Sequence, residues 1–249
     1  MSGHNKWASI KHKKAATDAK RGKIFTKIIR EMVVAAKEGG GIIENNARLR
    51  KAVDDARAAN MPQDNIKKAI QRGTGELPGA VYEEITYEGY GPAGVALIVE
   101  TTTDNKNRTA SEIRKIFSKH SGSMGETGCV GWMFSRKGLI TIDKTAGDED
   151  TIMTLALDSG ADDFVAEDDV YEIYTKPEDF NKVVDAIKAK NVAIMESELS
   201  MIPQTYVKLE GENAEHMLKL LDELEEHDDV KNVFSNFDIS KEDMEKYGA

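Results

Sequence analysis

"LITIDKTAGDEDTIMTLALDSGADDFVAEDDVYEIYTKPEDFNKVVDAIKAKNVAIMESELS", residues 139–200, alternates strand patterns with helix patterns. Short runs of apolar and β-branched residues predict strands, and apolar residues at three- and four-residue spacing predict helices. The resulting strands are 139–143, 164–167, 171–175 and 193–200, and the helices are 150–158 and 178–190. This order, βαββαβ, is that of the ferredoxin-like motif, in which two helices cover one face of an antiparallel sheet.

The segments on either side of this block contain a second set of the same elements. Their patterns predict helices at 108–120 and 214–226 and strands at 82–87, 95–102, 130–134, 206–209 and 230–237. Joining 95–134 to 206–237 gives βαβ plus βαβ again, and short connections at Lys137 and Pro203 allow the first block to interrupt it. We therefore predict an α+β protein with two ferredoxin-like domains, one inserted into the other. The discontinuous domain comprises 80–136 and 204–249, and the inserted domain comprises 137–203.

Residues 1–79 have a different pattern, which predicts a helical bundle. A first helix has apolar residues at helical spacing from Ile24 until Gly39 stops it, a second spans about 47–59, and a third begins at Pro62 and ends near Gly73. "GTGELPG", residues 73–79, fits neither periodicity and is predicted to be a linker. The chain thus begins with a small helical domain.

The charges are divided unequally between these domains. Residues 1–79 hold 17 Lys+Arg and 8 Asp+Glu, a balance of +9, although the whole chain has a formal net charge of −10. The remaining 17 basic and 36 acidic residues give 80–249 a balance of −19. Such asymmetry favours a basic module that meets a polyanion and an acidic body that does not.

The most concentrated basic stretch is "WASIKHKKAATDAKRGKIF", residues 7–25. Closely spaced cations bind nucleic acid by releasing the counterions condensed on its phosphates, and aromatic rings among them can stack on unpaired bases. The alternative is a solvated tail followed by ordinary exposed helix residues. The predicted nucleic-acid-binding residues are Lys6, Trp7, Lys11, His12, Lys13, Lys14, Lys20, Arg21, Lys23, Lys27, Arg30, Arg48, Arg50, Lys67, Lys68 and Arg72.

The polar stretch "TTTDNKNRT", residues 101–109, lies between a predicted strand and a predicted helix. Backbone N–H groups at the helix start, together with Asn105 and Arg108, could hold a phosphate. Capping of the helix by Asp104, Asn105 or Asn107 is the favoured interpretation.

No motif in the chain points to catalysis. "GSMGETG", residues 122–128, follows a predicted helix and precedes a strand, which is the wrong context for a dinucleotide loop, so a flexible turn is the better interpretation. Cys129 opens an apolar strand and is predicted to pack rather than react, and the histidines lack metal-ligand spacing. We expect no enzyme activity, no catalytic residue, no cofactor and no metal site.

Compartment and partners follow from composition. One cysteine cannot form an internal disulfide, which fits a reducing compartment such as the cytoplasm. The longest apolar run, residues 94–99, has strand length, so no membrane segment is predicted, and no secretory signal is recognised at the N-terminus. We expect a monomer or weak oligomer.

Four stretches resemble the YebC/PmpR family across essentially the whole chain. They are "GHNKWASIKHKKAATDAKRGKIFTKIIREM" (3–32), "NMPQDNIKKAI" (60–70), "YEGYGPAGVALIVETTTDNKNRT" (87–109) and "GCVGWMFSRKG" (128–138). The resemblance implies a helical N-terminal domain, two α+β domains with one inserted into the other, and a cytoplasmic, DNA-binding transcriptional regulator. Mitochondrial relatives are translational activators, and bacterial members have been linked to stalled ribosomes. Asn5, Ala47 and Cys129 depart from the usual pattern, and Ala47 leaves the start of the second helix uncertain.

Taken together, the sequence predicts a non-enzymatic, nucleic-acid-binding regulator of gene expression that contacts phosphates through residues 1–79. One alternative is a ribosome-associated translation factor that binds ribosomal or transfer RNA and relieves stalled translation. Another, of a different class, is a metal- or cysteine-dependent enzyme, for which no assembled site is evident. Lys and Arg bind the phosphates of DNA and RNA alike, so the sequence leaves that choice open.

Overall fold

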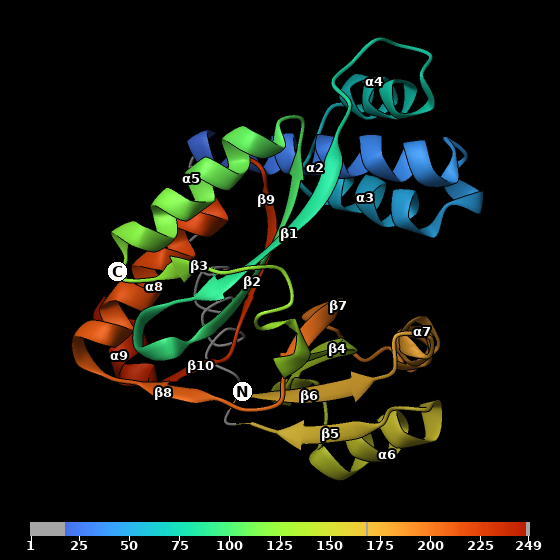
Figure 1. Ribbon diagram of the computed structural model, residues 1–249. Helices are drawn as coiled ribbons and strands as arrows, with labels where there is room; N and C mark the ends of the chain where they lie inside the picture. The colour runs from blue at the N-terminus through green and yellow to red at the C-terminus, as the bar shows by residue number, and fades with distance from the viewer. Residues whose placement is uncertain (1–17, 168, 248–249) are drawn as a thin grey trace.

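The computed structural model describes residues 18–167 and 169–247 (Figure 1). The predicted contacts of Lys6, Trp7, Lys11, His12, Lys13 and Lys14 therefore lie outside the described residues, as do the side chains of Lys20 and Arg21. Within the described ranges, no helix combines the length and the apolar character needed to cross a membrane.

The N-terminal module is a helical bundle, as predicted. Its core comes from the apolar faces of its three helices and includes Met32, Leu49, Val53 and Ile66. The buried side chain of Asn46 accepts the N–H of Leu49 and donates to the carbonyls of Ala35 and Gly40, so it both caps the second helix and ties it to the first. The elements are α2 (Asp18–Gly39), the short η1 (Ile43–Asn45), α3 (Ala47–Ala58) and α4 (Gln63–Thr74).

The main unit is an antiparallel sheet of order β3-β1-β2-β9, with α5 and α8 on one face. Residues of β2 such as Leu97 and Val99 pack against Phe117 of α5 and Leu221 of α8. A separate parallel pair, β8 with β10, and the short helix α9 complete the unit. The bounds are β1 (Glu83–Tyr90), β2 (Ala96–Thr103), α5 (Lys106–Lys119), β3 (Ser123–Met124), β8 (Val207–Leu209), α8 (Gly211–Glu226), β9 (Val230–Ser235), β10 (Phe237–Ile239) and α9 (Lys241–Tyr247).

The inserted unit has the predicted βαββαβ order and its own core. Its sheet has the order β5-β6-β4-β7 and is antiparallel throughout, and Ile140, Ile173 and Val183 are fully buried between this sheet and its two helices. This neighbour order is the one that a ferredoxin-like motif requires. The bounds are β4 (Phe134–Asp143), α6 (Glu149–Ser159), β5 (Asp163–Ala166), β6 (Val170–Thr175), α7 (Phe180–Ala189) and β7 (Glu196–Pro203).

One strand prediction in the main unit was wrong, and a second predicted strand forms but pairs outside the expected sheet. Residues 130–134 mostly form a 3₁₀ turn, η3 (Gly131–Met133), because the N–H groups of Val130 and Gly131 are bound by the carboxylate of Glu88 instead of by a sheet ladder. The very short β3 takes the edge position instead. The strand at 207–209 pairs with β10 outside the sheet, because the place beside β2 is already occupied by β1 through a local hairpin.

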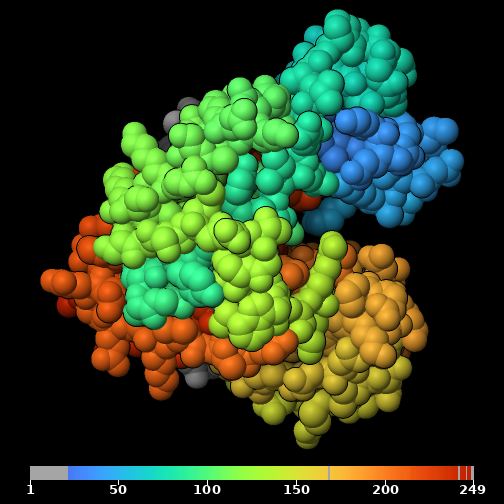
Figure 2. Space-filling model, in the orientation of Figure 1, coloured from blue at the N-terminus to red at the C-terminus, as the bar shows by residue number. Residues whose placement is uncertain are grey.

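In Figures 1 and 2 the N-terminal module lies at the upper right and the inserted unit at the lower right, with the main unit to their left. Helix α2 passes behind the main sheet next to the loop between α8 and β9, and this junction positions the module that carries most of the predicted binding residues (Figure 1).

Candidate nucleic-acid interface and the ion-pair junction behind it

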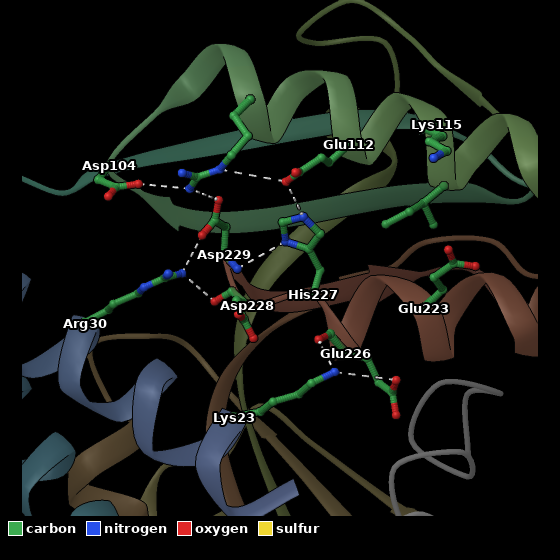
Figure 3. A pocket seen from close by; sticks show the side chains of 12 residues that line it. Lys23, Arg30, Asp104, Glu112, Lys115, Glu223, Glu226, His227, Asp228 and Asp229 are labelled. Atoms are coloured by element: carbon green, nitrogen blue, oxygen red, sulfur yellow. Dashed lines mark hydrogen bonds and ion pairs between the residues drawn. The ribbon is translucent and has the colours of Figure 1, made fainter. Parts of the chain in front are cut away.

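The basic stripe of helix α2 faces the main unit. Lys23 Nζ donates to the carbonyl of Glu226 at 3.1 Å, and Arg30 donates to that of Asp228 at 2.6 Å (Figure 3). Lys27 Nζ donates to the carbonyl of Glu225 at 2.5 Å. Helix α8 ends at Glu226, so its last carbonyl groups lack helical partners and carry the negative end of the helix dipole. Two of the predicted nucleic-acid-binding cations, Lys23 and Lys27, therefore bind the C-terminal carbonyls of a helix of the same chain, and a third, Arg30, binds the loop that follows it.

Asp229 is the centre of this junction (Figure 3). Its buried carboxylate accepts hydrogen bonds from Arg30 at 2.6 Å, Arg108 at 2.9 Å, and the hydroxyls of Thr109 and Thr103 at 2.6 and 3.2 Å. Burial opposes ionisation, but the hydrogen bonds from Thr109 and Arg108 and the charge of Arg30 outweigh it and lower the pKa of Asp229 to about 2. One ionised side chain thus joins the N-terminal module to α5 and β9.

The two residues predicted for a phosphate contact are both used within the chain. Asn105 is the N-cap of α5 and accepts the N–H of Arg108 at 3.1 Å, which is the capping role that the sequence favoured. The guanidinium of Arg108 pairs with Asp104 and Asp229 at 2.9 Å and lies 3.9 Å from Glu112. A cleft of about 610 Å³ opens beside them, lined by six Asp and Glu against four Lys and Arg. This charge balance makes the cleft a poor phosphate site, and a phosphate contact by Asn105 and Arg108 stays a prediction.

A group of three potential metal ligands, Glu112, His227 and Asp229, lies at the edge of the same cleft. His227 accepts the backbone N–H of Asp229 at Nδ1, at 3.1 Å, and its Nε2 faces Glu112 at 3.0 Å. Both ring nitrogens have protein partners, and the Asp229 oxygens are held by arginine and threonine. The group is best described as a hydrogen-bonded part of the junction.

Arg48 is enclosed by a second ion-pair cluster, formed by residues of α2, α3, β1 and β9. Its guanidinium contacts the carboxylates of Glu31 at 2.7 Å, Glu38 at 2.7 Å and Glu84 at 2.5 Å. Lys231 of β9 joins the cluster through Glu31 at 2.9 Å. Burial opposes ionisation of Glu31 and Glu84, yet hydrogen bonds from Arg48 and the charge of Lys231 lower the pKa of both. The predicted contact of Arg48 with nucleic acid would have to compete with three carboxylates.

Helix α4 presents the predicted cations that remain accessible. Lys67, Lys68 and Arg72 are exposed, and none forms an ion pair with any residue of the described ranges. Lys68 and Arg72 are four positions apart and so share one face of the helix, with Lys67 beside them. Arg50 is also exposed and donates to the carbonyl of Glu44 at 2.6 Å. The structure therefore separates cations on α2 and α3 that bind carboxylates or carbonyls of the chain from three exposed cations on α4 without an ion-pair partner among the described residues.

Sequence reasoning missed the two acidic residues that organise these regions. Asp229 follows Asp228 after a helix and looks like part of a solvated turn, and Glu88 looks like an exposed position of a strand. The available signal for Glu88 was the glycine-rich stretch at 122–131, since closely spaced glycines expose backbone N–H groups to a carboxylate. For Asp229 no local signal existed, because its partners lie far away in sequence.

Comparisons with known proteins agree with this architecture. A family model described as the TACO1/YebC protein N-terminal domain matches residues 5–76, and one described as the TACO1/YebC second and third domain matches residues 82–237. The chain is 66% identical over 251 residues to a "Probable transcriptional regulatory protein" of Endomicrobium trichonymphae, covering 100% of both chains. It is 59% identical over 246 residues to a protein of the same name from Trichlorobacter lovleyi, covering 99% of both.

A solved structure has the same fold. The crystal structure of a conserved hypothetical protein from Aquifex aeolicus superposes with a TM-score of 0.81 at 44% sequence identity, covering 90% of this chain and 93% of that one. The predicted α+β fold and the resemblance to YebC proteins are both confirmed. With matched models along most of its length and relatives of such high identity, the chain belongs to the TACO1/YebC family.

Proposed function

We propose that this protein is a non-enzymatic, nucleic-acid-binding regulator of gene expression that contacts phosphates through its N-terminal module, residues 1–79. The names of its relatives, probable transcriptional regulatory proteins, support a regulatory role. Its single thiol, Cys129, suits the reducing cytoplasm, where we place this activity.

The observation that carries the proposal is the accessible cationic face of α4. Lys67, Lys68 and Arg72 are exposed on one 12-residue helix and have no carboxylate partner in the described chain. Cations held apart from carboxylates on a protein of net charge −10 are free to gain from counterion release when they meet a row of phosphates. The sequence adds four more lysines among residues 1–17.

A ribosome-associated factor that binds ribosomal or transfer RNA is the second candidate. The main and inserted units carry a net −19, which a long uniform duplex would repel. The same acidic units suit a site where RNA is interleaved with basic proteins, such as a ribosome. We therefore favour RNA over promoter DNA as the main target in the cell, with the protein acting as a monomer or weak oligomer.

Alanine substitution on α4 tests the proposal. Replacing Lys67, Lys68 and Arg72 together should weaken binding of RNA and of DNA. It should also reduce the slope of log K against log salt by about 0.7 to 0.9 for each lost phosphate contact. The control is the triple alanine variant of Lys182, Lys188 and Lys190, three exposed lysines in or next to α7 of the inserted unit. Both variants remove three charges, so equal losses of affinity would show that net charge alone matters and would contradict the proposal.

A further inference from the structure

The loop between β3 and β4 is built around a buried carboxylate. Glu88 is only 7% exposed and accepts the backbone N–H groups of Gly128 at 2.8 Å, Val130 at 2.7 Å and Gly131 at 2.7 Å. Burial opposes its ionisation, but these three hydrogen bonds lower the pKa of Glu88. Hydrogen bonds to an ionised acceptor are short and strong, so the loop is anchored, which corrects the flexible turn expected from its glycines.

Glycines in this loop allow its backbone to lie close to the side chains of Glu88 and Cys129. A Cβ atom at Gly131 would lie 3.2 Å from a carboxylate oxygen of Glu88, and one at Gly125 would lie 2.5 Å from Sγ of Cys129. Gly128 has a φ of +89°, a conformation that other residues rarely adopt. The sequence of the loop is therefore specified by the geometry that surrounds Glu88 and Cys129.

What this loop presents to solvent is an aromatic pair. Trp132 is 69% exposed, and its indole N–H donates to the carbonyl of Cys129 at 3.1 Å. The hydroxyl of Tyr90, a residue that is 38% exposed, donates to the same carbonyl at 3.1 Å. Both polar tips are thus bonded to the protein, which orients the rings while leaving much of their surface to solvent. The segment that joins β3 to β4 lies on the visible face of the molecule (lime in Figure 2).

The surroundings of the pair distinguish between possible occupants. A protein-binding hot spot lies in the well-packed, largely apolar centre of an interface, whereas a nucleobase needs a flat π face among polar or cationic groups. The loop residues before Trp132 include exposed Glu126, Thr127 and Gly128, and exposed Arg136 follows it. This setting is polar and suits a base better than an apolar protein surface.

We propose that Trp132, supported by Tyr90 and held in place by the loop around Glu88, is a preorganised stacking platform for an unpaired nucleobase of the bound nucleic acid. The inference rests on the proposed function and adds to it a second, base-contacting site in the acidic part of the chain. Trp132 is the stacking residue, and Glu88 is a positioning residue that acts through the loop.

Tryptophan fluorescence tests this directly, because the chain has only two tryptophans, Trp7 and Trp132. In the full-length Trp7→Phe protein, a short single-stranded RNA should quench the emission of Trp132, and the duplex of the same sequence should not. In the wild-type chain, Trp132→Ala should weaken single-strand binding roughly 5- to 150-fold, the equivalent of one lost base stack, with duplex binding unchanged. Trp132→Phe should retain most of the affinity, and Met195→Ala, which removes an exposed apolar side chain at the far end of the inserted sheet, should have no effect.

A second variant separates stacking from folding. Glu88→Gln removes the charge that binds the N–H groups of the loop. In the Trp7→Phe protein it should therefore lower the fluorescence anisotropy of Trp132 and weaken binding of the single strand. The salt-dependent part of the affinity, which we assign to Lys67 and Lys68, should be unchanged. The stacking platform would be overturned, and the proposed function left intact, by two results together. RNA would bind in a salt-dependent way without quenching Trp132, and Trp132→Ala would bind as tightly as wild type. Equal losses for single strand and duplex would also overturn it. If no nucleic acid binds at all, the proposed function fails first.

Discussion

At the residue scale, Asp229 joins the N-terminal module to the main unit. Its carboxylate is the common acceptor for a cation of α2, a cation of α5 and two threonine hydroxyls. Removing one partner of a buried ion pair leaves the opposite charges uncompensated, which costs more than the pair itself contributes. Among the described ion pairs of the junction, Arg30 with Asp229 is the least exposed to solvent.

Asp229→Asn should therefore lower the free energy of unfolding by about 3 kcal/mol, measured by urea denaturation at neutral pH. Asp228→Asn is the matched control, because Asp228 is exposed and contacts Arg30 only through its backbone carbonyl, which the substitution keeps. A control variant as unstable as Asp229→Asn would show that the side chain of Asp229 is not the centre of the junction.

The destabilisation caused by Asp229→Asn should depend on pH and become smaller in acid. The pKa of Asp229 is lowered from an ordinary value of 3.8 to about 2, so its stabilisation is complete above about pH 5 and is lost as the pH falls from there through 2. The difference in unfolding free energy between wild type and Asp229→Asn should shrink by about 2 kcal/mol over that interval and stay constant above pH 5. A difference that does not change between pH 4 and 2 would contradict the assigned role.

At the element scale, helix α2 acts as the connector between modules because its cations reach the C-terminus of α8. Replacing Lys23 and Lys27 with Ala should leave the carbonyls of Glu225 and Glu226 without these donors and destabilise the protein by about 1 to 2 kcal/mol. Amide hydrogen exchange should accelerate at the end of α8 and not in the core of the bundle. Lys115→Ala is the control, since Lys115 lines the same cleft and has no ion-pair partner in the described residues. Unchanged exchange at the end of α8 in the double variant would refute the connector role.

Also at this scale, local patterns predicted the elements whose partners are near in sequence. The inserted unit, with Ile140, Ile173 and Val183 buried in its core, was predicted in its element order because each strand and helix shows its own periodicity, although β4 begins five residues earlier and β7 lies three residues later than expected. The strand at 130–134 was predicted wrongly because Glu88, some 40 residues earlier, captures its N–H groups. Pairing with a distant carboxylate leaves no trace in the periodicity of the segment.

In the candidate site, too, the sequence predicted local features but not contacts between distant segments. A stripe such as Lys23, Lys27 and Arg30 looks alike in sequence whether its partner is a phosphate or the carbonyl end of a helix about 200 residues away. The basic character of the N-terminal module could therefore be predicted, but which of its cations remain accessible could not. Only the folded arrangement separates Lys67, Lys68 and Arg72 on α4 from Arg48, which is enclosed by carboxylates.

At the scale of the whole molecule, the basic N-terminal module and the acidic inserted unit are separate lobes beside the main unit (Figure 1). Residues 137–203 hold 6 Lys and 16 Asp and Glu, so we expect the inserted unit to repel phosphates and the exposed cations of α4 to attract them. Under the proposed function, we expect this charge difference to orient the protein on a polyanion with the N-terminal module toward the phosphates. We also expect the acidic inserted unit to meet basic protein surfaces if the polyanion is part of a ribosome.

Ultraviolet crosslinking in cells, with identification of both the crosslinked peptides and the attached nucleic acid, tests this account most directly. We predict that peptides from residues 1–79 are crosslinked, and that the attached nucleic acid is ribosomal or transfer RNA more than promoter DNA. The signal should fall in the α4 triple variant and persist in the α7 control. Crosslinks confined to residues 80–249, or a single promoter motif recovered with no RNA above the level of the α4 variant, would contradict the account.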